Sequence, residues 1–269
     1  MNADRSHAPL AHALLGLVLT LLASLLVLPI VALIFRVPPL ALAARMTDRL
    51  VLDALRLSLV TSLASTALSV ALGLPLAWLL ATRRFPGRSL VRTLVELPMV
   101  LPPTVAGVGL LLAFGRSGLA GGALRAIGVE LPFTTAAVVL AQSFVAAPFF
   151  ITSAAAGMAE VEPRYLAVAS TLRATPWTVF RRVLLPLAMP AIVAGAAMSW
   201  ARALGEFGAT ITFAGNMPGV TQTMPLAVYL ALQTDLEAAI ALSVLLLVLS
   251  FGLLYTLRRL RGEDARAAS

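Results

Sequence analysis

Six apolar runs divide this sequence, and each is about as long as a helix that crosses a bilayer. Such a helix needs about 20 predominantly apolar residues, and runs of this kind lie at about 13–35, 57–82, 97–114, 133–158, 188–213 and 236–257. Hydrophobic residues make up 60% of the chain and charged residues only 12%, so lipid must cover much of its surface. The sequence therefore predicts an all-α integral membrane protein with about six transmembrane helices.

The apolar runs separate three parts of the chain. Residues 1–56 are predicted to hold an N-terminal tail, a first transmembrane helix and, over about 36–56, an amphipathic segment at the outer interface. Residues 57–257 form the helical core with a long inner segment at 159–187, and residues 258–269 form a C-terminal tail. In the core, the run at 97–114 contains Leu97-Pro98 and Leu101-Pro102-Pro103, a pattern typical of an interrupted helix that lines a cavity or packs inside protein.

Arginines indicate the orientation of the chain. If the N-terminus lies inside, thirteen arginines fall in inner segments and six in outer segments. The positive-inside bias therefore predicts that both termini are cytoplasmic. The inner arginines are Arg5, Arg83, Arg84, Arg88, Arg92, Arg164, Arg173, Arg181, Arg182, Arg258, Arg259, Arg261 and Arg266.

Composition excludes several kinds of chemistry. All 20 Lys+Arg residues are arginines, so the chain has no Walker A phosphate-binding lysine and no lysine for a Schiff base. It has no cysteine, and both histidines, His7 and His12, lie near the N-terminus, so we expect no metal site and no cofactor. The formal charge of +8 falls in short breaks between apolar runs, which argues against a nucleic-acid partner.

The inner segment at 159–187 has the composition of helices rather than of a loop. Glu162-Pro163 is typical of a helix start, with proline in the first turn and an acidic residue at the positive end of the helix dipole. Ala174-Thr175-Pro176 ends this helix, and a second short apolar face follows from Trp177. The residues alone leave two alternatives, a helical hairpin resting on the membrane surface and a docking surface for a partner protein.

Residues of this segment resemble the cytoplasmic "EAA" loop of ABC importer permeases. In that family Glu-Ala-Ala is followed by three residues, a glycine and, about nine residues later, a hydrophobic-x-Leu-Pro ending. The chain departs from the pattern at two positions, because Ala167 stands in place of the glutamate and Arg173 in place of the glycine. The resemblance rests on Ala167-Val-Ala-Ser-Thr-Leu-Arg173, Thr175-Pro176-Trp177, Phe180-Arg181-Arg182, Val183-Leu184-Leu185-Pro186 and Pro190.

A second resemblance, to the molybdate and sulfate branch of these permeases, covers nearly all of residues 52–257. It implies a type I ABC importer permease fold in a bacterial cytoplasmic membrane, importing molybdate or a related oxyanion. It also implies a homodimer, two separate ATPase subunits that hydrolyse ATP, and an extracytoplasmic substrate-binding protein. The matching stretches are Leu97-Pro98, Leu101-Pro-Pro-Thr-Val-Ala-Gly107, Ser199-Trp-Ala-Arg-Ala-Leu-Gly-Glu-Phe-Gly-Ala-Thr210, Gly215-Asn-Met-Pro-Gly219 and Thr223-Met-Pro-Leu-Ala-Val-Tyr229.

The inner segment is accordingly expected to couple the chain to its ATPase. Movement of the ATPase would pull on the helix near Pro163, and Pro186 and Pro190 would connect that motion to the fifth span. The residues expected to form the coupling surface are Pro163, Tyr165, Ala167, Ala169, Leu172, Arg173, Pro176, Trp177 and Pro186.

The fifth span carries two charged residues between stripes of small side chains. Ala191, Gly195, Ser199 and Ala203 recur every four residues, as do Ala197, Ala201, Gly205 and Ala209, which allows close helix approach. Arg202 and Glu206 are one turn apart and should pair or face water, since a lone charge in mid-membrane costs about 2.5–3.5 kcal/mol. Two interpretations remain: the pair only stabilises the helix, or Glu206 orients Arg202 toward a passing oxyanion. The residues expected to line the translocation pathway are Arg202, Glu206, Ser199, Thr104 and Gly107.

Three weaker signals lie in other spans. Ser58, Ser62, Ser65, Thr66, Ser69 and Gly73 share one face of the second span, which favours helix packing over a wet path. Thr104 and Gly107 follow the tandem prolines and indicate either a kinked helix end or a constriction of the pathway. In the fourth span, Gln142 is expected to make an interhelical hydrogen bond, and Pro148 to produce a kink.

Alternatives to an ATP-driven molybdate importer differ in class. A self-sufficient secondary transporter or channel would use Arg202 and Glu206 as an ion relay, but it would not need the segment at 159–187. An intramembrane enzyme is disfavoured because the six runs hold no histidine, cysteine or aspartate away from their ends. Within ABC importers, sulfate, tungstate and phosphate remain competing substrates, because oxyanions of like charge are distinguished chiefly by the external binding protein.

Overall fold

The computed structural model describes residues 8–36, 48–171 and 174–267. All regular secondary structure in these residues is helical, which confirms the predicted fold class. The helices are α1 (Ala8–Phe35), α3 (Arg49–Thr82), α4 (Arg88–Val100), α5 (Pro103–Phe114), α6 (Gly121–Ala126), α7 (Thr135–Ala159), α8 (Pro163–Thr171), α9 (Pro176–Val179), the π-helical turn η1 (Phe180–Leu184), α10 (Leu185–Leu204), α11 (Gly208–Ala214), α12 (Met224–Thr234) and α13 (Leu236–Ala267).

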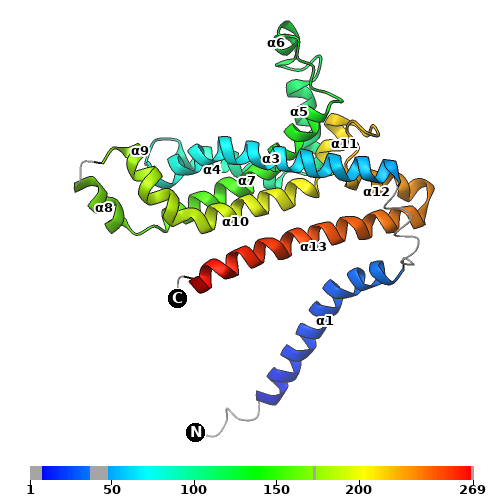
Figure 1. Ribbon diagram of the computed structural model, residues 1–269, viewed down its shortest axis with the longest axis horizontal. Coiled ribbons are helices and arrows are strands. Elements are labelled where there is room, and N and C mark those ends of the chain that lie inside the picture. The colour runs from blue at the N-terminus through cyan, green and yellow to red at the C-terminus, as the bar shows by residue number, and fades with distance from the viewer. Residues whose placement is uncertain (1–7, 37–47, 172–173, 268–269) are drawn as a thin grey trace.

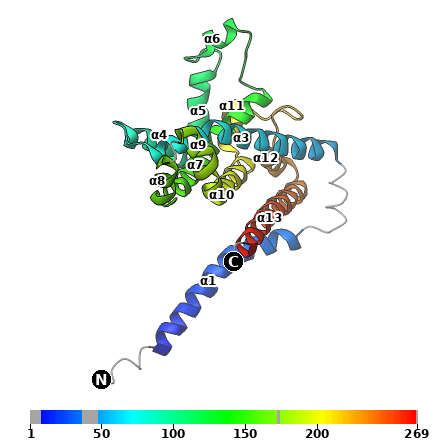
Figure 2. The same ribbon diagram turned by 60° about the vertical axis from the view of Figure 1, so that its left-hand side comes forward.

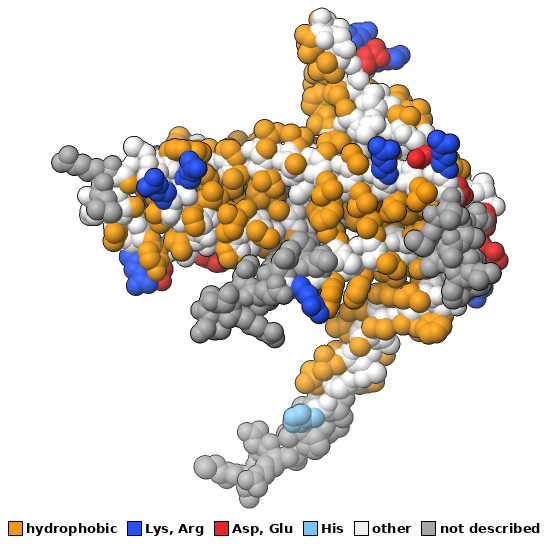
Figure 3. Space-filling model, viewed as in Figure 1, with side chains coloured by type: hydrophobic (Ala, Val, Ile, Leu, Met, Phe, Trp, Pro, Cys, Tyr) orange, Lys and Arg blue, Asp and Glu red, His pale blue; other side chains and the backbone are white. Residues whose placement is uncertain are grey.

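Within the described residues, five helical segments are long and apolar enough to cross a membrane, and a bent pair makes a possible sixth. The five are Leu14–Phe35 of α1, all of α3, all of α7, the continuous stretch Pro176–Leu204, and Leu236–Leu253 of α13. Hydrophobic side chains cover most of the face shown in Figure 3, and charged groups lie mostly near its ends. The prediction of about six spans is therefore confirmed.

The bent pair is α4 and α5, whose axes differ by 117°. The predicted run at 97–114 begins in the last turn of α4, so it is not one helix. Leu101 adopts an extended backbone (φ −64°, ψ 133°) because it precedes Pro102, and a residue before proline is driven away from the helical region. Pro103 then starts α5. In Figures 1 and 2, α5 rises away from the other helices with α6 near its tip.

Helix α3 begins earlier than the sequence pattern predicts. The Asp48 side chain accepts a hydrogen bond from the Leu50 backbone N–H (3.0 Å) and caps the helix, which then continues without a break to Thr82. Residues 49–56 are therefore part of this long helix and not of a separate amphipathic segment, and the division expected at 56/57 falls inside it. Residues 37–47 of that predicted segment lie outside the described part.

Small residues allow α3, α7 and α10 to pack side by side (Figure 1). A Cβ at Gly73 of α3 would lie 2.8 Å from the Ile151 side chain of α7, and a Cβ at Gly195 of α10 would lie 2.9 Å from Cβ of Ser153 on α7. The predicted stripe of Gly195, Ser199 and Ala203 is buried against this bundle, whereas Ala201 and Gly205 of the second stripe are exposed. The first stripe thus packs within the chain, whereas the second stripe is fully buried only at Ala209.

Different short helices lie at the two ends of the bundle. Helices α8 and α9 lie together at one end, and α12 lies near the other, as Figure 1 shows. Helix α13 continues to Ala267, so most of the expected C-terminal tail at 258–269 is helical. The position of α8 and α9 places the predicted coupling segment at the arginine-rich end of α3 and α4.

Candidate functional site

The fifth apolar run is interrupted at Glu206, the second of its two charged residues. The run at 188–213 was expected to be one helix, but α10 ends at Leu204 and α11 begins at Gly208. Glu206 lies in the break, where its Oε1 accepts a hydrogen bond from the Ala209 backbone N–H at 2.8 Å. The carboxylate thus satisfies one of the free N–H groups at the start of α11, which explains how a helix can end and restart in an apolar segment.

Arg202 and Glu206 form the ion pair that their spacing predicts. Arg202 Nη2 lies 2.7 Å from Glu206 Oε2. The two side chains differ sharply in burial, since 27% of Arg202 is exposed and only 1% of Glu206. The buried carboxylate therefore orients a guanidinium that still reaches the surface of the chain.

Arg202 has N–H donors that bind no other group within the described residues, and these donors lie at the exposed side of α10. A guanidinium has five N–H donors, and Glu206 is the one partner of Arg202 among the described residues. Met198 and Ala201, its neighbours on α10, are exposed as well. Such a fork of donors suits the oxygens of a tetrahedral anion.

Ser199 does not share this surface. It was predicted to line the pathway with Arg202, but its side chain is fully buried on the stripe that faces α7. Ser199 and Arg202 are three residues apart and therefore neighbours around α10, so the packing of the adjacent helices, and not the helical period, buries one and leaves the other partly exposed. The structure thus separates a packing face from an exposed charged face.

Thr104 and Gly107 of α5 lie against α11, the helix whose first turn is capped by Glu206 of the ion pair. A Cβ at Gly107 would lie 2.6 Å from Cβ of Thr212 and 2.9 Å from the Ala209 carbonyl oxygen, so α5 and α11 are in close contact. A Cβ at Gly208 would lie 3.1 Å from the backbone nitrogen of Thr104. The structure therefore brings the turn after the tandem prolines against the helix that Glu206 caps.

The hydroxyl stripe of α3 connects helices, which confirms the packing interpretation. Ser58 Oγ accepts from the Met224 backbone N–H at 2.6 Å, and Ser62 Oγ accepts from Trp200 Nε1 at 2.9 Å. Ser65 pairs with Ser143 of α7 at 3.2 Å. The stripe thereby joins α3 to α12, α10 and α7.

Alanine substitutions of two serines on this stripe should differ in their effect on the free energy of unfolding. Ser58→Ala leaves the buried Met224 N–H without an acceptor, so we expect a loss of about 1–3 kcal/mol in the free energy of unfolding. Ser69 Oγ has no partner among the described residues, and Ser69→Ala should be neutral or slightly stabilising. Chemical unfolding of both purified variants in detergent checks this, and equal losses would contradict it.

Gln142 does not make the interhelical hydrogen bond expected of it. Its side chain is fully buried, and neither amide atom has a partner among the described residues. The bond from this part of α7 comes from Ser143, because that residue is the one rotated toward α3. Ser143 is a contact that the sequence reasoning missed, and the facing serines of α3 were the available signal.

The predicted coupling segment contains the two expected helical pieces. Helix α8 begins at Pro163, directly after Glu162, as predicted. Tyr165 is exposed and Ala169 is buried. Leu172 and Arg173 lie outside the described residues, as does the side chain of Ala167.

The second piece is continuous with the fifth span, which the sequence pattern did not predict. Thr175 caps α9 through its side chain, and α9, η1 and α10 form one helical stretch, Pro176–Leu204, with Pro186 inside it. The Trp177 ring stacks on Phe180 at 5.4 Å between centroids, and Phe180 contacts Trp78 of α3 at 4.5 Å. Trp177 is nevertheless 60% exposed. An exposed aromatic residue is thus connected by one helix to Arg202.

The chain is similar to known transport proteins along most of its length. The model of the family described as "Binding-protein-dependent transport system inner membrane component" matches residues 73–260. The molybdenum transport system permease protein ModB of Mycobacterium tuberculosis is 48% identical over 223 residues, which is 83% of this chain and 84% of that one. The sulfate transport system permease protein CysT of Escherichia coli is 34% identical over 256 residues, 94% and 92% of the two chains.

Solved structures agree with this fold. A chain of a bacterial ABC transporter involved in import of the acidic polysaccharide alginate has a TM-score of 0.74 at 18% identity, over 95% of this chain and 97% of that one. A chain of an amino acid ABC transporter has a TM-score of 0.59 at 18% identity, over 82% and 97%. At this level of identity the likeness concerns the fold alone.

Proposed function

The chain belongs to the family of binding-protein-dependent transport system inner membrane components, and on this premise we propose that it carries molybdate, or a closely related oxyanion, into the cytoplasm as the membrane-spanning subunit of an ABC importer. It is a multi-pass inner membrane protein and not an enzyme. The 48% identity to a molybdenum permease over 83% of the chain carries the substrate proposal. Sulfate is the second candidate, because the sulfate permease of Escherichia coli matches 94% of the chain at lower identity.

The proposed assembly contains two copies of this chain, two ATPase subunits and an extracytoplasmic binding protein. Helices α8 and α9 contact the ATPases, and both termini are cytoplasmic. One relative with the same fold was crystallised with an alginate pentasaccharide-bound periplasmic protein. Support from the chain itself comes from the exposed side chains of Tyr165 and Trp177 at the end of the bundle, because exposed aromatic residues are typical anchors of protein interfaces.

Coupling follows from the continuity of Pro176–Leu204. When ATP binding closes the ATPases, α9 moves with them, and the helix transmits that motion to Arg202 and the break at Glu206. Helix α11 shifts against α5 because Glu206 caps its first turn. The cavity between the two copies thereby alternates between the two sides of the membrane.

Arg202 is the proposed contact for the oxyanion. It combines a positive charge with free donors, and the buried Glu206 keeps it oriented. Thr104 and Gly107, which lie in close contact with α11, are the proposed adjoining constriction. Phosphoryl transfer takes place in the partner ATPase and not in this chain.

Replacing Trp177 with alanine tests the proposed function. A tryptophan at the centre of an interface contributes about 2 kcal/mol or more, so ATPase binding should weaken about thirtyfold and ATP-dependent molybdate uptake should fall with it. Phe251→Ala is the matched control, because Phe251 is an exposed aromatic residue in a stacked pair on α13. The measurements are co-purification with the ATPase and uptake into proteoliposomes that contain the whole complex. Equal ATPase retention in both variants, or uphill uptake by the chain alone, would overturn the proposal.

A further inference from the structure

Two adjoining cavities lie where α3 turns into α4. The first, of about 420 Å³, is lined by Arg84, Phe85, Arg88, Ser89 and Arg92. The second is a narrow crevice of about 70 Å³ that shares Arg88 and Arg92 with the first. Its remaining walls come from α3, α4 and α7 and are almost entirely apolar: Leu80, Ala81, Val95, Ile151, Thr152, Ala155, Ala156 and Ala159.

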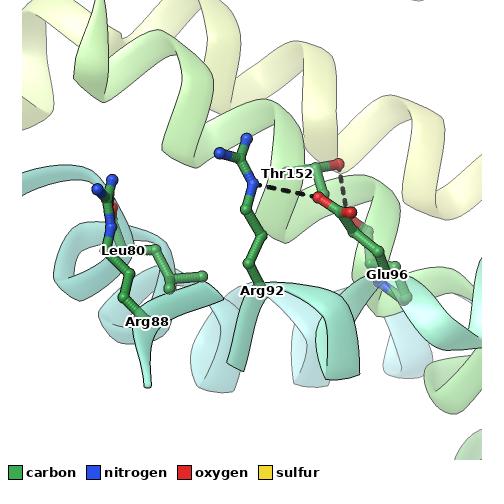
Figure 4. A network of polar contacts seen from close by, with 6 residues as sticks. Leu80, Arg88, Arg92, Glu96 and Thr152 are labelled. Carbon is green, nitrogen blue, oxygen red and sulfur yellow. Dashed lines mark hydrogen bonds and ion pairs between the residues drawn. The ribbon is translucent and has the colours of Figure 1, made fainter. Parts of the chain in front are cut away.

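Local structure sets the three arginines around the first cavity. Gly87 has a positive φ of 83°, which allows the tight turn from α3 into α4. Arg88 and Arg92 then lie one turn apart and extend from the same side of α4, as Figure 4 shows. Arg88 donates from Nε (3.0 Å) and Nη2 (2.5 Å) to the Leu80 carbonyl oxygen, so it is held in place without losing its charge.

The charge of this cluster is only partly compensated. Arg92 pairs with Glu96 at 3.2 Å, and Arg84 makes no hydrogen bond or ion pair within the described residues. Three arginines against one glutamate leave a surplus of two positive charges. The cluster therefore attracts an anion.

The apolar surroundings specify what kind of anion fits. The crevice continues from the arginines between α4 and α7, and the outer face of α4 exposes Leu90 and Leu94. A soluble anion, or an acidic protein surface, makes no use of an apolar crevice. An amphiphile fills both parts, with its charged group on the arginines and a hydrocarbon chain in the crevice.

We propose that this composite cavity binds an anionic phospholipid. The lipid phosphate accepts hydrogen bonds from Arg84, Arg88 and Arg92, and the start of one acyl chain lies along Val95, Ile151 and Ala155. A lipid bound there joins the α3–α4 turn to α7 beside the coupling helices.

The test uses the full transporter complex in nanodiscs of phosphatidylcholine mixed with phosphatidylglycerol, with retained lipid counted by native mass spectrometry. Phosphatidylglycerol should be retained selectively, and Arg84→Gln should weaken retention about fivefold, since a basic residue near an anionic membrane contributes about 1 kcal/mol. Arg83→Gln is the matched control, because it removes the same charge from the adjacent, exposed position without touching the cavity.

A second variant tests the crevice separately from the charge. Ala156 is exposed at the crevice, so Ala156→Leu should fold normally, obstruct the acyl chain and reduce lipid retention. Glycerol phosphate, which has no acyl chain, should not displace the lipid. The proposal is overturned if Arg83→Gln and Arg84→Gln act equally, if Ala156→Leu has no effect, if glycerol phosphate competes as well as the lipid, or if crosslinking shows the ATPase covering the cavity.

Discussion

Arg202→Gln is expected to lower the free energy of unfolding by about 3–5 kcal/mol, whereas Glu206→Gln should cost only about 1 kcal/mol. The asymmetry follows from burial. Without Arg202, the Glu206 carboxylate stays 1% exposed with its charge unpaired. Without the Glu206 charge, Arg202 is left 27% exposed and is not enclosed by the chain, and the glutamine oxygen can still accept the bond from Ala209. Chemical unfolding of both purified variants measures the difference, and equal costs would contradict it.

The double variant Arg202→Gln/Glu206→Gln separates folding from transport. It contains no buried charge, so its stability should return to within about 1 kcal/mol of Glu206→Gln. If Arg202 contacts the oxyanion, molybdate flux in the assembled complex should remain at least tenfold below normal, because a charge-assisted hydrogen bond contributes about 1.5–3 kcal/mol. Normal flux in this stable variant would show that the pair serves packing alone.

Two glycines of α5 should respond in opposite ways to alanine. A Cβ at Gly107 would lie 2.9 Å from the Ala209 carbonyl oxygen and 2.6 Å from Cβ of Thr212, and a backbone oxygen cannot rotate away. We expect Gly107→Ala to cost about 1–3 kcal/mol through overpacking and to displace α11, which Glu206 caps. Molybdate flux should fall with it.

Gly109→Ala is the control for this contact. Nothing lies within 4 Å of a Cβ at Gly109, so this variant should be stabilised by up to about 1 kcal/mol through helix propensity. Unfolding curves and molybdate uptake of the two variants, side by side, give the comparison. Equal behaviour would mean that α5 and α11 are not in the close contact described above.

Local features of the sequence were sufficient for the membrane fold and for part of the site. Runs of about 20 apolar residues predict transmembrane helices because backbone polar groups in hydrocarbon must bond within their own segment. The four-residue spacing of Arg202 and Glu206 predicts their ion pair, and Glu162-Pro163 predicts the start of α8. Each of these signals depends on a few neighbouring residues.

Other features depend on contacts between distant segments and could not be predicted. The apolar pattern ran through Gly205 without a signal of a break, because the break is stabilised by the Glu206 cap on α11 and by the contact of α11 with α5. Hydrogen bonding of Ser143 rather than Gln142 depends on the rotation of α7 against α3.

The sequence by itself determined that the chain is a helical membrane protein of this permease family, because hydrophobic length and short motifs are local properties. The tertiary structure alone decided which residues share a surface. It joined Trp177 to Arg202 through one helix, placed Ser199 inside the bundle, and gathered Arg84, Arg88 and Arg92 beside an apolar crevice. The physical reason is that helix rotation and helix breaks are set by packing and by backbone hydrogen bonds between segments, which apolar periodicity does not encode.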